Sequence, residues 1–139
     1  MKCVELNPTG HFDPWEPEKI SELKANDLNR GMGNDLMFEN ETVKLWGICL
    51  RPYERLPFRK QKGQFSWTCV TGGLAISRYS DGKICLLRFE KGDVAYWNLE
   101  NDELISDLEN IGEDVLRITI LEHKPLPNTK PSKETRKTA

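Results

Sequence analysis

The residues best suited to chemistry fall in two segments of opposite charge. Residues 51–62 contain five basic side chains and a single acidic one, Glu54, whereas residues 98–114 contain seven acidic side chains and no basic one. Arginine offers a rigid two-pronged donor to carboxylates and other oxyanions. Arg59, near the end of the basic segment, is therefore a candidate either to bind an external anion or to form an internal ion pair.

Cysteine chemistry is the second candidate. The four cysteines are far apart and form no C-x-x-C pair, and Cys49, Cys69 and Cys85 lie inside apolar runs. We therefore expect reduced, inert thiols rather than a metal or redox site. The chain also contains no Gly-rich phosphate loop of the usual spacing and no Ser/His/Asp combination that can be placed with conviction.

Length and charge limit the classes of partner. A chain of 139 residues with 37% hydrophobic and 30% charged residues is expected to be one globular domain. Beyond His123 five basic residues stand against one acidic residue, +4, which leaves −6 on the rest of a chain whose net charge is −2. An acidic body argues against nucleic acid as a partner. No apolar run approaches the roughly 20 residues of a membrane span, so we expect no membrane partner and a cytoplasmic location.

The pattern divides the chain into three parts. Residues 1–32 form an N-terminal extension with a short helix, which starts near Asp13, ends near Asn26 and places Ile20 and Leu23 on one face. Residues 33–124 form the main β-rich unit. Residues 125–139, rich in Pro, Lys and Thr, are expected to be a flexible basic tail.

The main unit consists of short β-prone runs separated by turn signals. The eight runs are 36–40, 42–50, 65–70, 74–79, 84–90, 94–98, 103–108 and 115–123, and "RPYERLPFRKQKGQ" (51–64) is interpreted as a break. The clearest hairpin is "SRYSDGKICLLRF", with Asp81-Gly82 at its tip. Many short strands without intervening helices indicate an all-β, antiparallel, double-sheet sandwich or barrel.

This order of elements resembles the cupin family of small jelly-roll barrels over residues 33–124. The first cupin signature, G-x5-H-x-H-x3,4-E-x6-G, carries three of the four metal ligands. It can be laid on the segment from Tyr53 to Gly72 or Gly73. The positions of the two histidines and the glutamate then hold Arg59, Gln61 and either Phe65 or, with the longer spacing, Ser66.

The second signature, which supplies the third histidine, starts at Gly92-Asp93 and ends at Asn110. Counting back from Asn110 puts Ser106 at the histidine position. None of these replacements is a good ligand, since arginine stays protonated and the others lack imidazole or carboxylate. We therefore expect a cupin-like barrel with no metal and no cofactor.

The resemblance also indicates what the interior contains. If Arg59 and Gln61 face inward as the matching histidines would, strand alternation places Phe65, Trp67 and Cys69 on the same side, with Ser106 on the opposite sheet. The first hypothesis is a non-metal binding or accessory protein for a small anionic or carboxylated molecule. Its expected ligand-binding residues are Arg59, Gln61, Phe65, Ser66, Trp67, Tyr96 and Ser106.

Other interpretations remain open. The interior can be filled by side chains, in which case the barrel is purely structural, or Arg59 can pair with Asp107 or Glu103 across the barrel. A metal-independent, isomerase- or epimerase-like enzyme acting on a small carboxylated or sugar-like metabolite would use Arg59 as anchor and Tyr96 or Cys69 to handle protons. The resemblance further implies a homodimer formed through sheet edges and the N-terminal segment.

Overall fold

The computed structural model describes residues 1–25, 28 and 31–125. The expected basic tail lies outside the described residues from position 126 onward. One helix and eight strands are defined: β1 (Lys2–Asn7), α1 (Pro17–Lys24), β2 (Asp35–Glu39), β3 (Val43–Leu50), β4 (Arg55–Cys69), β5 (Gly73–Arg78), β6 (Ile84–Phe89), β7 (Val94–Asn110) and β8 (Leu116–His123). Among these elements, no helix is both long and apolar enough to cross a membrane.

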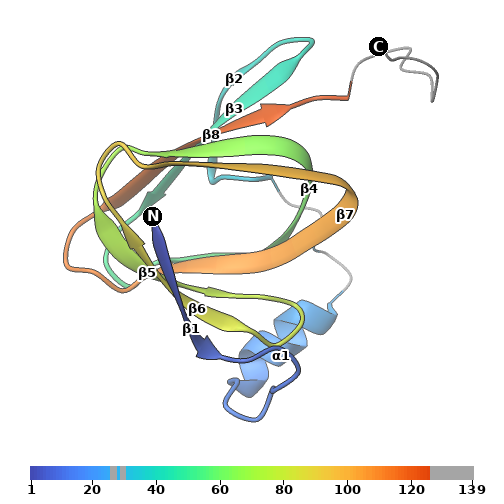
Figure 1. Cartoon of the computed structure of the whole chain (residues 1–139), viewed down its shortest axis with the longest axis vertical. Coiled ribbons are helices and arrows are strands. Elements are labelled where there is room, and N and C mark those ends of the chain that lie inside the picture. The colour runs from blue at the N-terminus through green and yellow to red at the C-terminus, as the bar shows by residue number, and fades with distance from the viewer. Residues whose placement is uncertain (26–27, 29–30, 126–139) are drawn as a thin grey trace.

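All strand pairs are antiparallel, and the strand order is β1-β6-β5-β7-β4-β8-β3-β2. Figure 1 shows β2, β3 and β8 in one layer and β1, β5 and β6 in the other, with β4 and β7 bending through both. Along its second half β4 pairs with β7 on one side and with β8 on the other. The expectation of an all-β, double-sheet jelly roll is confirmed.

The hairpin at Asp81-Gly82 is also found where the sequence indicates it. Strands β5 and β6 pair from Gly73↔Phe89 to Arg78↔Ile84, and the turn between them contains Gly82 at φ +98°. A residue with a side chain is strained at that φ, so glycine suits the turn.

The interpretation of residues 51–64 as a break is wrong, because β4 begins at Arg55 and continues through this segment. Two irregularities hide the strand in the sequence. The register with β7 shifts between Leu56 and Arg59, which accommodates Pro57 at a bulge, and it shifts again at Gly63, which has φ +74°. Opposite Gly63, residues 99–102 bulge out of β7, so the runs 94–98 and 103–108 belong to one bent strand.

The first bulge decides which side chains enter the barrel. Leu56 pairs with Leu108 and Arg59 with Ser106, so three steps along β4 match two along β7. Because side chains alternate along a strand, the extra residue returns Arg59 to the interior face and turns Phe58 to the other face. Phe58 is nevertheless fully buried, because Trp15 stacks on it with ring centroids 5.9 Å apart.

The N-terminal segment is tied to the barrel by β1 and α1. Strand β1, which has no counterpart among the expected runs, pairs with β6. Helix α1 contributes Glu22, whose carboxylate accepts hydrogen bonds from both terminal nitrogens of Arg55, at 2.8 and 3.1 Å, and from the Phe58 backbone N–H at 2.8 Å. The Phe58 N–H therefore donates to Glu22 at the position of the bulge.

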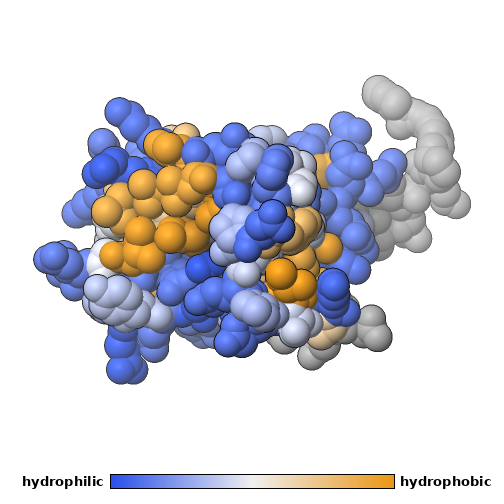
Figure 2. Space-filling view, turned by 90° about the horizontal axis from the view of Figure 1, so that it is seen from below, coloured by the Kyte–Doolittle hydropathy of each residue, from blue (hydrophilic) through white to orange (hydrophobic). Residues whose placement is uncertain are grey.

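The core consists of inward residues from both layers. It contains Met32, Ile48, Leu50, Leu56, Phe65, Trp67, Cys69, Ala75, Cys85, Leu87, Phe89, Leu108, Leu116, Ile118 and Ile120. Some apolar side chains stay outside. Val4 and Leu6 on β1 are about half exposed, and Figure 2 shows apolar residues gathered between polar ones on the face seen from below.

Candidate functional site

Arg59 is an arginine almost fully enclosed by the barrel, with 1% of its surface exposed. Its Nε donates to the Met32 carbonyl oxygen at 3.0 Å, and its Nη1 donates to the Ser106 carbonyl oxygen at 3.4 Å. The Nη2 group has no hydrogen-bond partner among the described residues. A charged donor that is both buried and unsatisfied is unusual in a folded protein, since most such groups have a partner.

Gln61 is the next inward residue on β4 and is equally enclosed, at 1% exposure. Its Nε2 donates to the Ser106 Oγ at 3.0 Å, while its Oε1 has no partner among the described residues. Arg59 and Gln61 therefore both contact Ser106, which lies opposite Arg59 on β7. We call these three residues the Arg59 cluster.

The expected ion pair between Arg59 and Asp107 or Glu103 is not formed. Asp107 instead accepts hydrogen bonds from Arg55 Nε at 2.6 Å and Arg78 Nη1 at 2.8 Å. Glu103 lies 3.9 Å from Lys60 Nζ and 3.1 Å from Lys62 Nζ. The bulge explains why Asp107 pairs with Arg55 and not with Arg59. It lies between Leu56 and Arg59 and turns Arg59 to the interior face, away from the Asp107 carboxylate.

The electrostatic consequence is a cation without a counterion among the described residues. Burial lowers the pKa of Arg59 to about 10, and the negative charge of Asp107 only partly opposes this effect. A pKa of about 10 leaves the guanidinium protonated at neutral pH. Among the described residues, the Arg59 cluster therefore presents a fixed positive charge, one donor nitrogen (Nη2) without an acceptor and one carbonyl oxygen (Gln61 Oε1) without a donor inside the barrel.

An aromatic group forms another part of the interior. The rings of Phe65 and Trp97 stack with centroids 5.1 Å apart, and Trp67 lies 5.2 Å from Trp97. Phe65 and Trp67 are buried, as expected for inward positions of β4. The Trp67 Nε1 has no hydrogen-bond partner among the described residues.

Two of the expected ligand-binding residues lie apart from the Arg59 cluster. Ser66 lies between the inward Phe65 and Trp67 on β4, so its side chain is on the opposite face of the strand. Tyr96 pairs with Ser66 across β4 and β7 and shares that outer face. Tyr96 is 59% exposed, so its hydroxyl faces outward rather than into the barrel. Cys69 does lie inside, but burial raises the pKa of its thiol, which favours the neutral form over a reactive thiolate.

Met32 is a residue of the site that the sequence analysis missed. It precedes β2, is 4% exposed, and accepts the Arg59 Nε hydrogen bond through its carbonyl oxygen. Neither its residue type nor its position in a Gly-rich segment signals this contact, because any residue can supply a backbone carbonyl.

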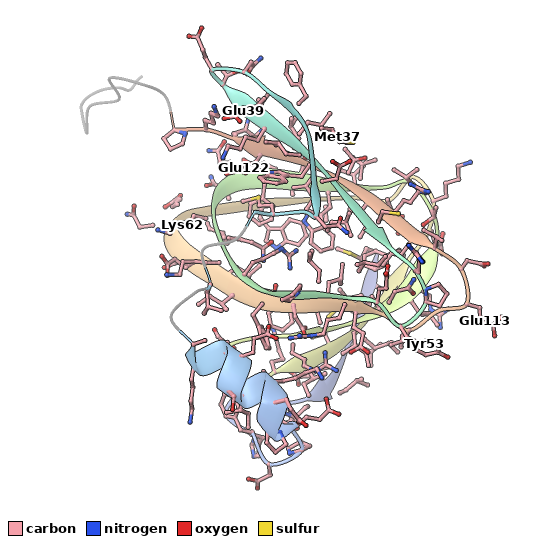
Figure 3. All side chains as sticks on the ribbon, turned by 180° about the vertical axis from the view of Figure 1, so that it is seen from behind. Met37, Glu39, Tyr53, Lys62, Glu113 and Glu122 are labelled. Atoms are coloured by element: carbon pink, nitrogen blue, oxygen red, sulfur yellow. The ribbon has the colours of Figure 1, made fainter. Side chains whose placement is uncertain are left out.

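Met32 also borders an external cleft of about 380 Å³. The lining residues are Gly31, Met32, Lys44, Trp46, Lys60, Lys62 and Glu122. Figure 3 shows Lys62 and Glu122 at the same end of the barrel. Glu122 accepts a hydrogen bond from Trp46 Nε1 at 2.8 Å. Three lysines against one glutamate give the cleft a positive charge, and Met32 separates it from Arg59.

The site offers no group of metal ligands. Within the described residues, no three His, Cys, Asp or Glu side chains lie close enough together to hold a metal ion. The positions of the cupin ligands are taken by the Arg59 cluster and by either Phe65 or Ser66. The donor set is a guanidinium, an amide and a hydroxyl, which suits an oxyanion better than a divalent cation.

The two-layered barrel matches known structures. A cupin domain from Bordetella pertussis superposes with a TM-score of 0.58 and 14% sequence identity, covering 68% of this chain and 100% of that one. The chain has the cupin fold. An RmlC-like cupin protein with a double-stranded β-helix fold from Methanocaldococcus jannaschii gives a TM-score of 0.52 and 16% identity, covering 64% of this chain and 76% of that one. In sequence, no protein-family model and no curated protein matches.

Proposed function

We propose that this cupin barrel binds a small anionic molecule at the Arg59 cluster, without a metal. The observation that carries the proposal is the Arg59 guanidinium, which is 1% exposed, has no ion pair with a described carboxylate and keeps Nη2 unpartnered. Burying an isolated charge is costly unless an opposite charge compensates it. An anionic ligand would supply the missing charge and accept the free N–H.

The surroundings of Arg59 support binding rather than a purely structural ion pair. Among the described residues, both hydrogen-bond partners of the guanidinium are neutral backbone carbonyls, from Met32 and Ser106. The carboxylates that the sequence offered as partners are held by other basic residues, Arg55 and Arg78 for Asp107 and two lysines for Glu103. The positive charge of Arg59 is therefore available to a ligand.

The lysine-lined cleft supports the same proposal from outside. Lys44, Lys60 and Lys62 surround an opening that borders Met32, the residue whose carbonyl contacts Arg59. A cleft with a net positive charge raises the local concentration of anions and speeds their association. We therefore assign this cleft as the approach route for the anion.

The test is thermal unfolding of the full chain with the sodium salts of formate, acetate, glycolate and hydrogen carbonate at pH 8, beside Mn²⁺, Ni²⁺ and Zn²⁺. At a concentration near 100 times the Kd, a bound anion stabilises the fold by about 2.7 kcal/mol, a shift of several degrees. We expect at least one anion to raise the midpoint, and no divalent cation to form a one-to-one complex.

Two variants locate the effect. Arg59→Met replaces the buried cation with an apolar side chain, so the barrel should still fold while the anion-induced shift disappears. Arg51→Met is the matched control, because the Arg51 side chain is 80% exposed and lies outside the barrel. A shift that persists in Arg59→Met, or no shift with any anion, would reject the site. A tight complex with a divalent metal would reject the metal-free assignment.

A further inference from the structure

The free carbonyl of Gln61 restricts which anions fit the Arg59 cluster. Gln61 uses its amide nitrogen on Ser106 Oγ at 3.0 Å, and its carbonyl oxygen has no hydrogen-bond partner among the described residues. A buried acceptor without a donor costs about 1–3 kcal/mol. The ligand must therefore bring a donor to Gln61 as well as a negative charge to Arg59.

We infer that the ligand is a small anion that also carries its own O–H donor, namely a short 2-hydroxycarboxylate or hydrogen carbonate. This inference rests on the proposed function. The anionic oxygens accept from Arg59 Nη2, and the hydroxyl donates to Gln61 Oε1. A simple carboxylate satisfies only the first contact and turns oxygen lone pairs toward the Gln61 carbonyl.

The spacing of the two residues sets the size of the ligand. Arg59 and Gln61 are two positions apart on one strand, so their Cα atoms are separated by roughly 6.6 Å. Both side chains also converge on Ser106 from the same strand face. The charge and the donor of the ligand must therefore lie within a few bonds of each other, as they do in glycolate and in hydrogen carbonate.

Burial excludes larger members of the same chemical class. Arg59 and Gln61 are each 1% exposed and Ser106 is 6% exposed, so side chains of the barrel surround the cluster closely and leave little space for a ligand. A nucleotide sugar or a long-chain acid would leave most of its surface outside this enclosure. We therefore restrict the assignment to anions of about four to six heavy atoms, the range from hydrogen carbonate to lactate.

The experiment compares pairs of anions that differ chiefly in the donor. Isothermal titration of the full chain at pH 8 would measure the Kd of glycolate against acetate and of hydrogen carbonate against nitrate, a planar monoanion of similar size. We expect the O–H-bearing member of each pair to bind at least about tenfold more tightly, because its partner leaves Gln61 unpaired.

The variant Gln61→Met removes the acceptor while keeping the length of the side chain. It should lower the glycolate-to-acetate preference to about onefold. Gln64→Met is the matched control, because Gln64 lies on the same strand and is exposed. If Gln61→Met does not fold, the two Kd ratios in the parent protein still decide the inference.

The outcomes separate the two proposals. Equal affinity for both members of each pair, or a tenfold preference that survives in Gln61→Met, overturns the O–H donor requirement while the anion site stands. Absence of binding by all four anions overturns the proposed function itself and leaves an internal water as the partner of Arg59. A preference in the parent that is lost in Gln61→Met and kept in Gln64→Met supports both.

Discussion

The Arg59 cluster is defined as much by what its side chains lack as by what they contact. Arg59 is buried with two neutral carbonyl partners, and one end of Gln61 is satisfied while the other is not. Each unsatisfied buried group lowers the stability of the empty barrel. An anion that carries its own O–H would give Arg59 Nη2 an acceptor and Gln61 Oε1 a donor. Its binding would therefore stabilise the fold, which couples ligand affinity to the free energy of unfolding.

The charge state of Arg59 gives a pH prediction. Its pKa is lowered to about 10 from its ordinary value, because burial disfavours the charged form. We expect the glycolate affinity to be constant from pH 8 to 9 and to fall toward tenfold per unit above pH 10, where Arg59 loses its proton. Titration calorimetry between pH 8 and 11 measures this, with circular dichroism confirming that the protein is folded.

Stability of the unliganded protein should respond to pH with the opposite sign. Above about pH 10, and below the ordinary pKa of arginine, the unfolded state holds a proton on Arg59 that the folded state has lost. The contribution of Arg59 to the free energy of unfolding therefore rises as pH increases through this window.

The variant Lys62→Met is the control for the pH profile of glycolate binding. It should leave that profile unchanged, which would show that Lys62 does not cause the loss of affinity above pH 10.

At the scale of elements, hydrophobic alternation indicated most of the sheet but not the two bulges between β4 and β7. The runs at 74–79, 84–90 and 115–123 match β5, β6 and β8 because each keeps one register along its length. Residues 51–64 read as a loop because Pro57 and Gly63 are turn formers and the basic side chains conceal the alternation. The bulges that absorb both residues depend on pairing with β7, a long-range contact that no local pattern reports.

The same reasoning explains which parts of the site could be anticipated. Arg59, Gln61 and Ser106 were found by laying a family motif on the sequence, and the register places them together. The choice of partners could not be found that way. Whether Asp107 pairs with Arg55 or Arg59 depends on the bulge between Leu56 and Arg59, which changes the face of the strand.

The contact between α1 and β4 gives a prediction about elements. Glu22 binds both terminal nitrogens of Arg55 and the Phe58 N–H at the bulge, so Glu22→Ala leaves a partly buried guanidinium and a backbone donor without this partner. We expect a loss of about 1–3 kcal/mol in the free energy of unfolding, measured by urea titration at pH 7. Glu18→Ala, on the exposed first turn of the same helix, should cost no more than about 1 kcal/mol. Equal effects of the two substitutions would show that Glu22 does not hold the helix to the barrel.

Across the whole molecule, the described N-terminal segment packs against the outer face of the barrel. Strand β1 extends the sheet beyond β6, and Trp15 stacks on Phe58 while its Nε1 donates to the Gly82 carbonyl oxygen at 2.9 Å. Trp15 therefore joins the segment before α1 to β4 and to the tip of the β5–β6 hairpin. These contacts predict that the described N-terminal segment and the barrel unfold as one cooperative unit.

Truncation of Trp15 tests that cooperativity. Because Trp15 is 6% exposed and its ring fills the space over Phe58, Trp15→Ala should lower the free energy of unfolding by about 3–5 kcal/mol. Tyr96→Ala, at a position 59% exposed, should lower it by well under 1 kcal/mol.

In the parent protein, urea unfolding followed by tryptophan fluorescence and by far-ultraviolet circular dichroism should give coincident transitions. An early fluorescence transition, with the β-sheet signal unchanged, would mean that the N-terminal segment unfolds on its own and contributes little to the barrel. Coincident transitions that shift together in Trp15→Ala would show that the segment stabilises the same core that encloses Arg59, so that its loss weakens the anion site as well as the fold.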